Sequence, residues 1–299
     1  KGLVKRDIIR VVTPGTVDAS MLEGGRSNYI CAVCMDDESA GLAFCDITTG
    51  KTHATSFTGP ERLSHVENEL GRFSPVEAVL NDGAFQQTGL IGLLREKFNC
   101  LTQNGGEARF RLEAAAEQVE RQFGKDQADR LPKTNSAALL ALGGLLGYLY
   151  ETQKTDLSHI RELEYYEEGR FMELDLTARR NLELTATMRD KEKRGSLLWV
   201  LDRTKTAMGG RLLRSWLERP LLSVAAINKR LASVEALVKS AMDREELIAA
   251  LTGIGDMERL IGRIVYGSAG GRDLASLRAA LGKLPELKEK LSPFPAGRL

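Results

Sequence analysis

The sequence predicts an α/β domain with a mixed sheet, followed by an all-α domain. Three β-rich segments, at 28–35, 41–47 and 51–57, are separated by short polar turns and indicate a three-stranded meander. Amphipathic helices and a further short strand at 76–80 come next, an order typical of a mixed sheet with packed helices. After residue 156 the pattern is helical, apart from one short strand candidate at 160–166.

Several details of the first domain follow from local patterns. Polar and β-branched residues alternate along 51–57, which favours an edge strand, and Gln103-Asn-Gly-Gly106 is typical of a loop. Gly50-Lys51-Thr52 resembles the end of a phosphate-binding loop. That motif needs a glycine at position 45, which is Cys, and a helix directly after it. We therefore interpret Gly50-Lys-Thr as a hairpin turn.

The helical domain is organised around residues 175–220. Met208, Leu212, Leu213, Trp216 and Leu217 have the spacing of a buried helical stripe, so the arginines between them are expected on a solvated outer face. Asp175 or Thr177 can cap the first helix, and Ser223 caps a later one. Asp243 with Glu246 forms a capping-box pattern, and Pro285 is expected to end the helix that begins near Arg272.

Composition sets broad limits on function. The chain has 299 residues, 42% of them hydrophobic and 28% charged, which suits two folded domains. No run of 18 apolar residues occurs, so no membrane span is expected. Residues 1–155 hold 17 basic and 20 acidic side chains, whereas 156–299 hold 25 and 21, a weaker basic bias than nucleic-acid-binding domains usually show. Lys1-Gly-Leu-Val-Lys-Arg6 contains no initiator Met or signal peptide, so we expect a segment of a longer polypeptide.

The four cysteines and three histidines predict no metal or redox site. Cys31 and Cys34 have the C-x-x-C spacing, but they lie on a predicted strand, where residues three apart face opposite sides. We interpret all four cysteines as reduced core residues of a cytoplasmic protein. The histidines are scattered, and no cofactor is expected to bind to this segment.

One enzyme hypothesis deserves consideration. A meander followed by helix, strand and helices is the order of a ribonuclease-H-like fold, whose nucleases bind two metal ions through carboxylates, one of them on the first strand. Here the first strand, Tyr29-Ile-Cys-Ala-Val-Cys34, contains no acid. Asp46 leads directly into a turn, where an aspartate usually stabilises the turn. An active nuclease is therefore the least favoured alternative.

Several stretches resemble the bacterial MutS family of mismatch-recognition ATPases. Gly41-Leu-Ala-Phe-Cys-Asp-Ile-Thr-Thr-Gly50 is similar to the family's connector domain. Three further stretches are similar to its core domain: Leu174-Asp-Leu-Thr-Ala-Arg-Arg-Asn-Leu-Glu-Leu184, Leu198-Trp-Val-Leu-Asp-Arg-Thr204 and Met208-Gly-Gly-Arg-Leu-Leu-Arg-Ser-Trp-Leu217. The resemblance runs in collinear order over nearly the whole chain.

The resemblance implies a linker at 1–20, a ribonuclease-H-like connector domain at 21–133, and the first part of an all-α core (lever) domain at 134–299. It also implies that the mismatch wedge, the DNA clamp and the ATPase lie elsewhere in the parent protein, which would bind ATP and Mg²⁺, mismatched duplex DNA, MutL and a second MutS subunit. This segment would have no catalysis of its own. Its role would be to couple DNA binding to the ATPase, with helices 136–153 and 205–219 as levers and 130–134 and 155–158 as hinges.

Two surfaces are candidates for contacts. The helix at 112–123 carries a polar face opposite its apolar side, and we expect MutL to contact Gln118, Arg121 and Gln122 on it. As an alternative function, the chain would bind the DNA backbone directly through Arg189, Lys191, Lys193 and Arg194. Glu183, Asp190 and Glu192 interleave with these cations, which favours intrahelical and solvated ion pairs instead.

Overall fold

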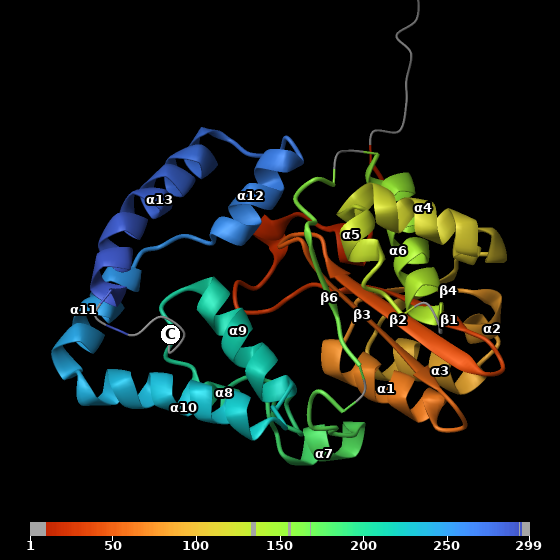
Figure 1. Cartoon of the computed structure of the whole chain (residues 1–299), viewed down its shortest axis with the longest axis horizontal. Coiled ribbons are helices and arrows are strands. Elements are labelled where there is room, and N and C mark those ends of the chain that lie inside the picture. Colours follow the sequence, from red (N-terminus) through yellow and green to blue (C-terminus); the bar gives the residue numbers. More distant parts are fainter. Residues whose placement is uncertain (1–9, 133–135, 155–156, 168, 293, 295–299) are drawn as a thin grey trace, which may run out of the picture. The chain divides into compact units, whose positions relative to one another are not determined.

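The computed structural model describes residues 10–132, 136–154, 157–167, 169–292 and 294. They form two compact units (Figure 1). The first takes in the described residues within Lys1–Leu22, Asn28–Glu168 and Val265–Gly267, and the second takes in those within Glu23–Ser27, Gly169–Ile264 and Ser268–Leu299. Two short segments therefore belong to a different unit from the residues on either side of them. Glu23–Ser27 belongs to the second unit, and Val265–Gly267 belongs to the first.

The first unit contains a six-stranded mixed sheet in the order β5-β4-β1-β2-β3-β6. Strands β1 (Ile30–Met35), β2 (Ser39–Asp46) and β3 (Lys51–Thr58) form the antiparallel meander that the sequence predicts. Strands β4 (Glu77–Leu80), β5 (Leu101–Asn104) and β6 (Glu162–Tyr165) pair in parallel with β1, β4 and β3, respectively. The mixed sheet followed by a helical region confirms the predicted fold class.

Two strand predictions were wrong. β3 is not an edge strand, because β6 pairs with it across a long sequence separation that no local pattern reveals. Residues 103 and 104, expected in a loop, end strand β5, and only Gly105 and Gly106 of that stretch follow the strand. The hairpin interpretation of Gly50 is confirmed, since it closes the turn between β2 and β3 with a positive φ of 75°. Residues 8–12 are also rich in β-forming side chains, but 8 and 9 lie outside the described residues, and 10–12 form no strand.

Helices cover both faces of the sheet (Figure 1). One face packs against α6 (Ala137–Gln153), with α4 (Leu112–Phe123) outside it, and α1 (Arg62–Phe73) packs on the other. Three short helices complete the first unit: α2 (Asp82–Phe85), α3 (Thr88–Gly92) and α5 (Lys125–Ala128). Helix α3 continues into a π-helical turn at Leu93–Lys97. Single 3₁₀ turns lie at Pro14–Thr16, Ala19–Met21 and Glu107–Phe110.

Helix α6 is the centre of the first unit. Twelve of its 17 residues are buried, and its leucines share one core cluster with Ile30, Ala32 and Cys34 of β1. The predicted domain boundary at 133/134 assigns this helix to the helical domain. In the structure it packs on the sheet, because it is apolar all round and must be covered on every side. Residues 133–135, at that boundary, lie outside the described residues.

The cysteines behave as predicted from strand geometry. All four are buried free thiols, and Cys34 faces the α6 core cluster whereas Cys31 lies outside that cluster. Burial raises the pKa of Cys34, Cys45 and Cys100 to about 12, so these thiols stay protonated at neutral pH.

The second unit consists of short and long helices. They are α7 (Leu176–Asn181), α8 (Leu197–Leu201), α9 (Ala207–Glu218), α10 (Val224–Lys239), α11 (Ala241–Leu251), α12 (Met257–Val265, whose last residue belongs to the first unit) and α13 (Gly271–Leu291). Asp175 caps α7 and Ser223 caps α10, as predicted, through hydrogen bonds to Ala178 N and Ala226 N.

Three expectations about these helices were wrong. Asp243 does not cap α11, which already begins at Ala241; its carboxylate instead accepts a hydrogen bond from the Ser240 hydroxyl. Pro285 lies inside α13, where the carbonyl it leaves unpaired can be hydrated because the helix is exposed there. The apolar stripe of α9 is not buried, since Leu212 is 50% and Trp216 40% exposed, whereas Arg211 and Arg219 are buried.

The close approach of α4 and α6 gives a test of the core. A Cβ on Gly143 would lie 2.3 Å from Ala115 Cα, which is backbone and cannot move aside. We predict that Gly143→Ala costs about 1–3 kcal/mol of unfolding free energy through overpacking. Gly147→Ala in the same helix meets only the flexible Arg109 side chain, at 3.4 Å, and should be neutral or stabilising by up to about 1 kcal/mol. Urea unfolding of both variants would measure the difference, and equal costs would contradict this packing.

Candidate functional site

The strands that would carry the metal-binding carboxylates of a ribonuclease-H-like nuclease hold residues that stabilise the fold instead. β1 carries no carboxylate, as its sequence shows. Asp46 at the end of β2 is buried, and its carboxylate accepts hydrogen bonds from Thr48 N (3.0 Å), Thr48 Oγ1 (2.7 Å) and Asn28 N (3.1 Å). The prediction that Asp46 forms a turn is confirmed. Among the described residues, no three His, Cys, Asp or Glu side chains are grouped so that they could hold a metal ion.

A second buried carboxylate, Glu77, anchors the turn at 13–16 to the sheet. Its side chain is fully buried and accepts hydrogen bonds from Thr13 Oγ1 (2.5 Å), Gly15 N (3.1 Å), Gln103 Nε2 (3.0 Å) and the Tyr148 hydroxyl. Burial and the bond to Glu77 raise the pKa of Tyr148 to about 12, so the phenol remains a donor. Sequence reasoning missed this cluster, although a lone acid at the start of an apolar strand was a usable signal.

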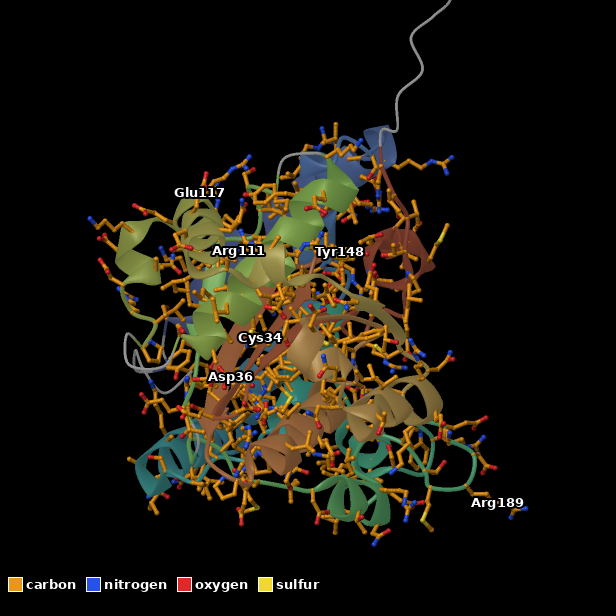
Figure 2. All side chains as sticks on the ribbon, turned by 90° about the vertical axis from the view of Figure 1, so that its right-hand side faces the viewer. Cys34, Asp36, Arg111, Glu117, Tyr148 and Arg189 are labelled. Carbon is orange, nitrogen blue, oxygen red and sulfur yellow. The ribbon has the colours of Figure 1, made fainter. Side chains whose placement is uncertain are left out.

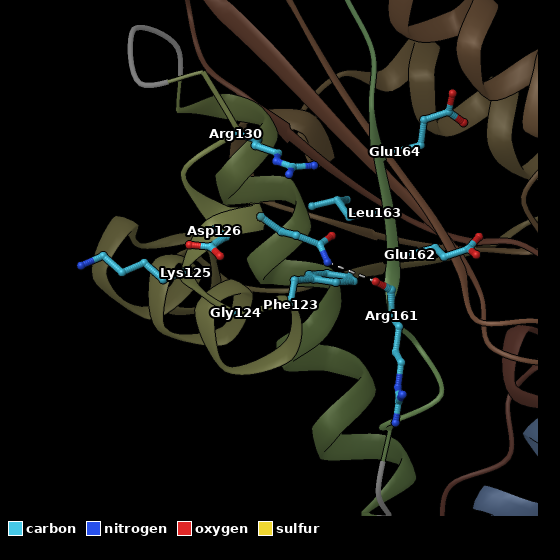
Figure 3. A pocket seen from close by; sticks show the side chains of 10 residues that line it. Phe123, Gly124, Lys125, Asp126, Arg130, Arg161, Glu162, Leu163 and Glu164 are labelled. Atoms are coloured by element: carbon cyan, nitrogen blue, oxygen red, sulfur yellow. Dashed lines mark hydrogen bonds between the residues drawn. The ribbon is translucent and has the colours of Figure 1, made fainter.

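An open groove of about 930 Å³ lies between β6 and the α4–α5 turn (Figure 3). Phe123 and Leu163 are apolar parts of its lining, and Gln127 Nε2 donates to the Arg161 carbonyl at 3.5 Å. The lining includes three cations (Lys125, Arg130, Arg161) and three acids (Asp126, Glu162, Glu164). This even balance of charge gives the groove no preference for phosphate groups.

Of the three α4 residues predicted to contact a partner, Arg121 is exposed, whereas Gln118 and Gln122 are half-buried. Arg121 is exposed, and its guanidinium lies 4.2 Å from the centroid of the Tyr150 ring. Gln122 is committed internally, because its amide donates to the carbonyls of Leu157 (3.0 Å) and Ile160 (2.6 Å) and accepts from Tyr150. Gln118 is half-buried, which leaves little of it for a partner.

Other α4 side chains are better placed to meet a partner. Glu117 of α4 is exposed, and so is Arg111, which directly precedes the helix; both are labelled in Figure 2. Leu112 is 51% exposed, because Ala115, Val119 and Phe123 are the α4 residues that are buried. The exposed part of α4 therefore combines an apolar side chain with charged ones.

The candidate DNA-backbone residues lie in a turn-rich loop rather than on a helix. Arg189, Lys191 and Arg194 are exposed, and Figure 2 shows Arg189 pointing away from the ribbon. Lys193 is held 2.6 Å from Asp202 Oδ2. The expected intrahelical pairs do not form, because α7 ends at Asn181 and the loop adopts positive φ angles at Glu183 and Lys191.

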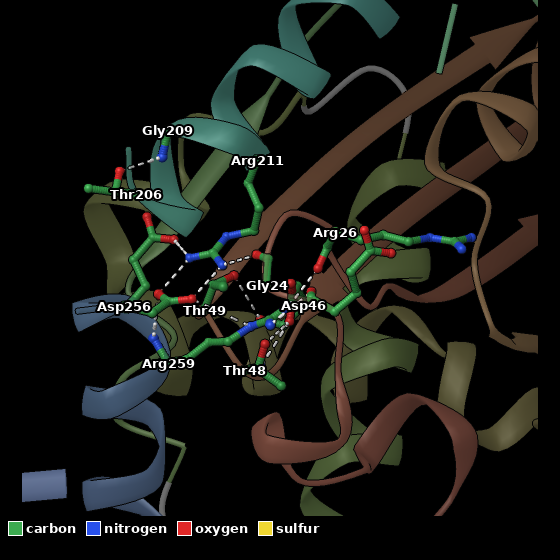
Figure 4. Close-up of polar contacts among 12 residues, drawn as sticks. Gly24, Arg26, Asp46, Thr48, Thr49, Thr206, Gly209, Arg211, Asp256 and Arg259 are labelled. Atoms are coloured by element: carbon green, nitrogen blue, oxygen red, sulfur yellow. Dashed lines mark hydrogen bonds and ion pairs between the residues drawn. The ribbon is translucent and has the colours of Figure 1, made fainter. Parts of the chain in front are cut away.

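The most extensive polar cluster in the second unit surrounds Arg211 of α9 (Figure 4). This guanidinium is 4% exposed and makes a bidentate pair with Asp256, at 2.6 and 2.7 Å, while Nη2 also lies 2.6 Å from Glu258 Oε2. Burial opposes ionisation of Asp256, but the hydrogen bonds and charge of Arg211 outweigh it and lower the pKa of Asp256. The pair is therefore charged at neutral pH.

The same cluster holds the segment 23–27, which we call the strap. Arg211 Nη1 donates to the Gly24 carbonyl at 2.8 Å. Arg259 of α12, itself 5% exposed, donates to the carbonyls of Glu23 (3.0 Å) and Arg26 (2.6 Å). Two cations, two carboxylates and three backbone carbonyls thus interact in one cluster, to which the strap contributes backbone carbonyls.

Sequence reasoning missed this cluster because it treated the arginines of α9 as solvated. The sequence contains only a weak indication of the cluster. Asp256 and Glu258 stand at the start of a predicted helix beside Arg259, but no local pattern pairs these two acids with Arg211. Arg179 of α7 caps the end of α9 by donating to the Glu218 carbonyl at 3.1 Å. None of the described helices is long and apolar enough to cross a membrane.

Comparison with known proteins agrees with both units. Sequence models of MutS domain II and MutS domain III match residues 28–161 and 177–298, respectively. The DNA mismatch repair protein MutS of Acetivibrio thermocellus is 40% identical over 99% of this chain, and that of Desulforamulus reducens is 41% identical over all of it. The chain spans about a third of the length of these relatives, 34% in each case. With both domains matched in order and this identity along the whole chain, the protein belongs to the MutS family, of which it carries domains II and III.

Proposed function

We propose that this segment couples mismatched-DNA binding to ATP hydrolysis within a MutS polypeptide and that its first unit offers a contact surface to MutL. In this proposal the polypeptide is cytoplasmic, ATP and Mg²⁺ bind elsewhere in it, it acts as a homodimer, and domains II and III carry out no catalysis. The observation that carries the proposal is the two-unit organisation of a mismatch-repair family member, in which each unit contains a segment that belongs in sequence to the other.

The proposed lever is α9, within the predicted 205–219 segment, because the Arg211 cluster joins its first turns rigidly to α12. Helix 136–153 suits this role less well, since as α6 it is enclosed by the sheet and α4. Of the proposed hinges 130–134 and 155–158, residues 133, 134, 155 and 156 lie outside the described residues. The hinges therefore rest on the sequence argument alone.

Hydrogen exchange tests the coupling. In the full MutS polypeptide that contains this segment, with mismatched DNA present, adding ATP should change exchange rates at 130–134 and 155–158 severalfold, because hinge residues absorb the dihedral changes of a domain movement. Strand β1, buried at every position, serves as the internal control and should not change. Unaltered exchange at both hinges would contradict the proposal.

The MutL contact predicts a charge-sensitive surface on α4. We expect Arg121→Glu to weaken binding of MutL by about tenfold or more, because the reversal places an uncompensated charge in the contact. Lys97→Glu makes the same charge change at an exposed position of the π-helical turn and should have little effect. Surface plasmon resonance with mismatch-bound protein would measure both, and equal affinities for the two variants would remove α4 from the interface.

Direct binding to the DNA backbone is the second candidate function, because Arg189, Lys191 and Arg194 are exposed on one loop. Each phosphate contact adds about 0.9 to the slope of log K against log salt, so removing three contacts should lower that slope by about 3. Under the coupling proposal, replacing all three residues with alanine should leave the slope unchanged. Fluorescence anisotropy of the chain and of the full polypeptide on duplex DNA, from 50 to about 200 mM salt, would separate the two functions.

A further inference from the structure

The outer edge of β6 and the groove beside it form one surface of the first unit. Among the described strands, β6 is the last of the sheet, and only β3 pairs with it. The groove of about 930 Å³ runs along the other side of β6, between this strand and the α4–α5 turn (Figure 3). All of these elements belong to the first unit, so the geometry of the surface depends on that unit alone.

The backbone of β6 directs alternate polar groups into this groove. Tyr166, directly after the strand, donates its N–H to the Ala54 carbonyl at 3.2 Å and thus faces β3. The Arg161 carbonyl faces the opposite way, because it accepts a hydrogen bond from a side-chain amide of α5 across the groove, at 3.5 Å. Backbone groups of a strand point alternately to its two sides, so those of Leu163 and Tyr165 point in the same direction as that of Arg161.

These outward backbone groups are available for a further strand. Within the part of the chain that the structure describes, no residue outside the sheet makes a hydrogen bond to the backbone of Leu163 or Tyr165. A row of N–H and C=O groups at the edge of a sheet is a template on which another extended chain can pair. The edge of β6 therefore fits an extended peptide rather than a helix or a small molecule.

The side chains on the two faces of β6 determine which peptide fits. Leu163 and Phe123 of α4 are the apolar parts of the groove lining. Figure 3 shows Glu162 and Glu164 on the other side of the strand, pointing away from the α4–α5 turn. Side chains of an added strand would alternate in the same way and would lie beside the same groups. The surface thus favours aliphatic residues on the groove side and basic residues beside the two acids.

A second copy of this chain does not match this surface. Pairing of two β6 strands edge to edge would place Glu162 and Glu164 across from the same acids of the other copy, and like charges directly opposite each other destabilise a sheet. β6 is also short, at four residues, and short charged edges are typical of strands that avoid pairing with themselves. The occupant is therefore a strand of different sequence.

We propose that the first unit binds an extended peptide segment of another protein, which adds to β6 as a further strand, with aliphatic residues towards the groove and basic residues beside Glu162 and Glu164. In this mode, main-chain hydrogen bonds give affinity and alternate side chains give specificity. The four residues of β6 correspond to about 13 Å of peptide. The site lies on β6 and not on the α4 residues predicted to contact MutL, so it goes beyond the proposed function.

Selective N-methylation of a probe peptide tests the strand addition. The probe is a capped, fluorescein-labelled octapeptide of alternating valine and lysine, and fluorescence anisotropy measures its binding to the 299-residue chain. Only one edge of the peptide can face β6. Methylating the valine amides and methylating the lysine amides should therefore give dissociation constants that differ by about tenfold or more. Equal constants for the two methylated peptides, or no binding of the unmethylated probe, would overturn the proposal.

Two substitutions at one position provide matched protein variants. Leu163→Pro removes the N–H that points towards the groove and should weaken binding of the probe by about tenfold or more. Leu163→Ile keeps the amide and an aliphatic side chain, and should bind the probe as the parent chain does. Circular dichroism checks that both variants fold. If Leu163→Pro does not fold, the comparison of the two methylated probes on the parent chain decides. Equal affinities of the two folded variants would contradict strand addition at β6.

Charge reversal tests the preference for basic residues. Glu162→Lys places a cation beside the basic face of the probe and should weaken binding by about threefold or more at low salt. Glu113→Lys makes the same charge change at an exposed position of α4 outside the groove lining, and should have little effect. Equal effects would indicate non-specific attraction and would rule the site out. So would a chain that binds no probe but forms a dimer that Leu163→Pro abolishes in analytical ultracentrifugation.

Discussion

Burial of α6 against the sheet is the constraint on which the first unit depends. This helix has apolar residues on every side, so a neighbour must cover each of its faces. Small residues make that possible at the closest points: a Cβ on Gly41 would lie 1.9 Å from the Ala137 carbonyl oxygen, and one on Gly143 would overlap Ala115. The sheet, α4 and the Glu107–Phe110 turn are therefore held at separations that glycine alone allows, and the surface of α4 takes its orientation from this packing.

Each unit also contains one buried charged cluster that fixes an irregular segment of chain. Glu77 does this for the turn at 13–16 and Arg211 with Arg259 does it for the strap. In both places side-chain charges bind backbone groups, which gives directional bonds to segments that have few apolar residues to bury. Removing one partner from such a cluster leaves a buried charge unpaired, at a cost of about 3–5 kcal/mol, so these clusters fix the path of the chain more strictly than surface ion pairs do.

Local patterns predicted the meander, the fold class, the caps at Asp175 and Ser223 and the turn at Asp46, because each depends on residues close together in sequence. They did not predict contacts between distant residues: the pairing of β6 with β3, the position of α6, or the burial of Arg211. For α9 the pattern gave the wrong face, since the ion pairs with Asp256 and Glu258 outweigh the preference of Leu212 and Trp216 for burial. Gln122 was misplaced for the same reason, because its amide bonds to carbonyls 35 and 38 residues away.

Helix α10 differs from every other long helix of the second unit, because none of its 16 residues is buried. Its apolar residues Val224, Leu231, Val234 and Val238 are 57–70% exposed. A helix held mainly by its own backbone bonds and the cap at Ser223 has little tertiary stabilisation to lose when it melts. Among the long helices of the second unit, the amides of α10 should therefore exchange with the smallest free energy of opening. The stability measured for the second unit will then depend on which helix carries the spectroscopic or exchange probe.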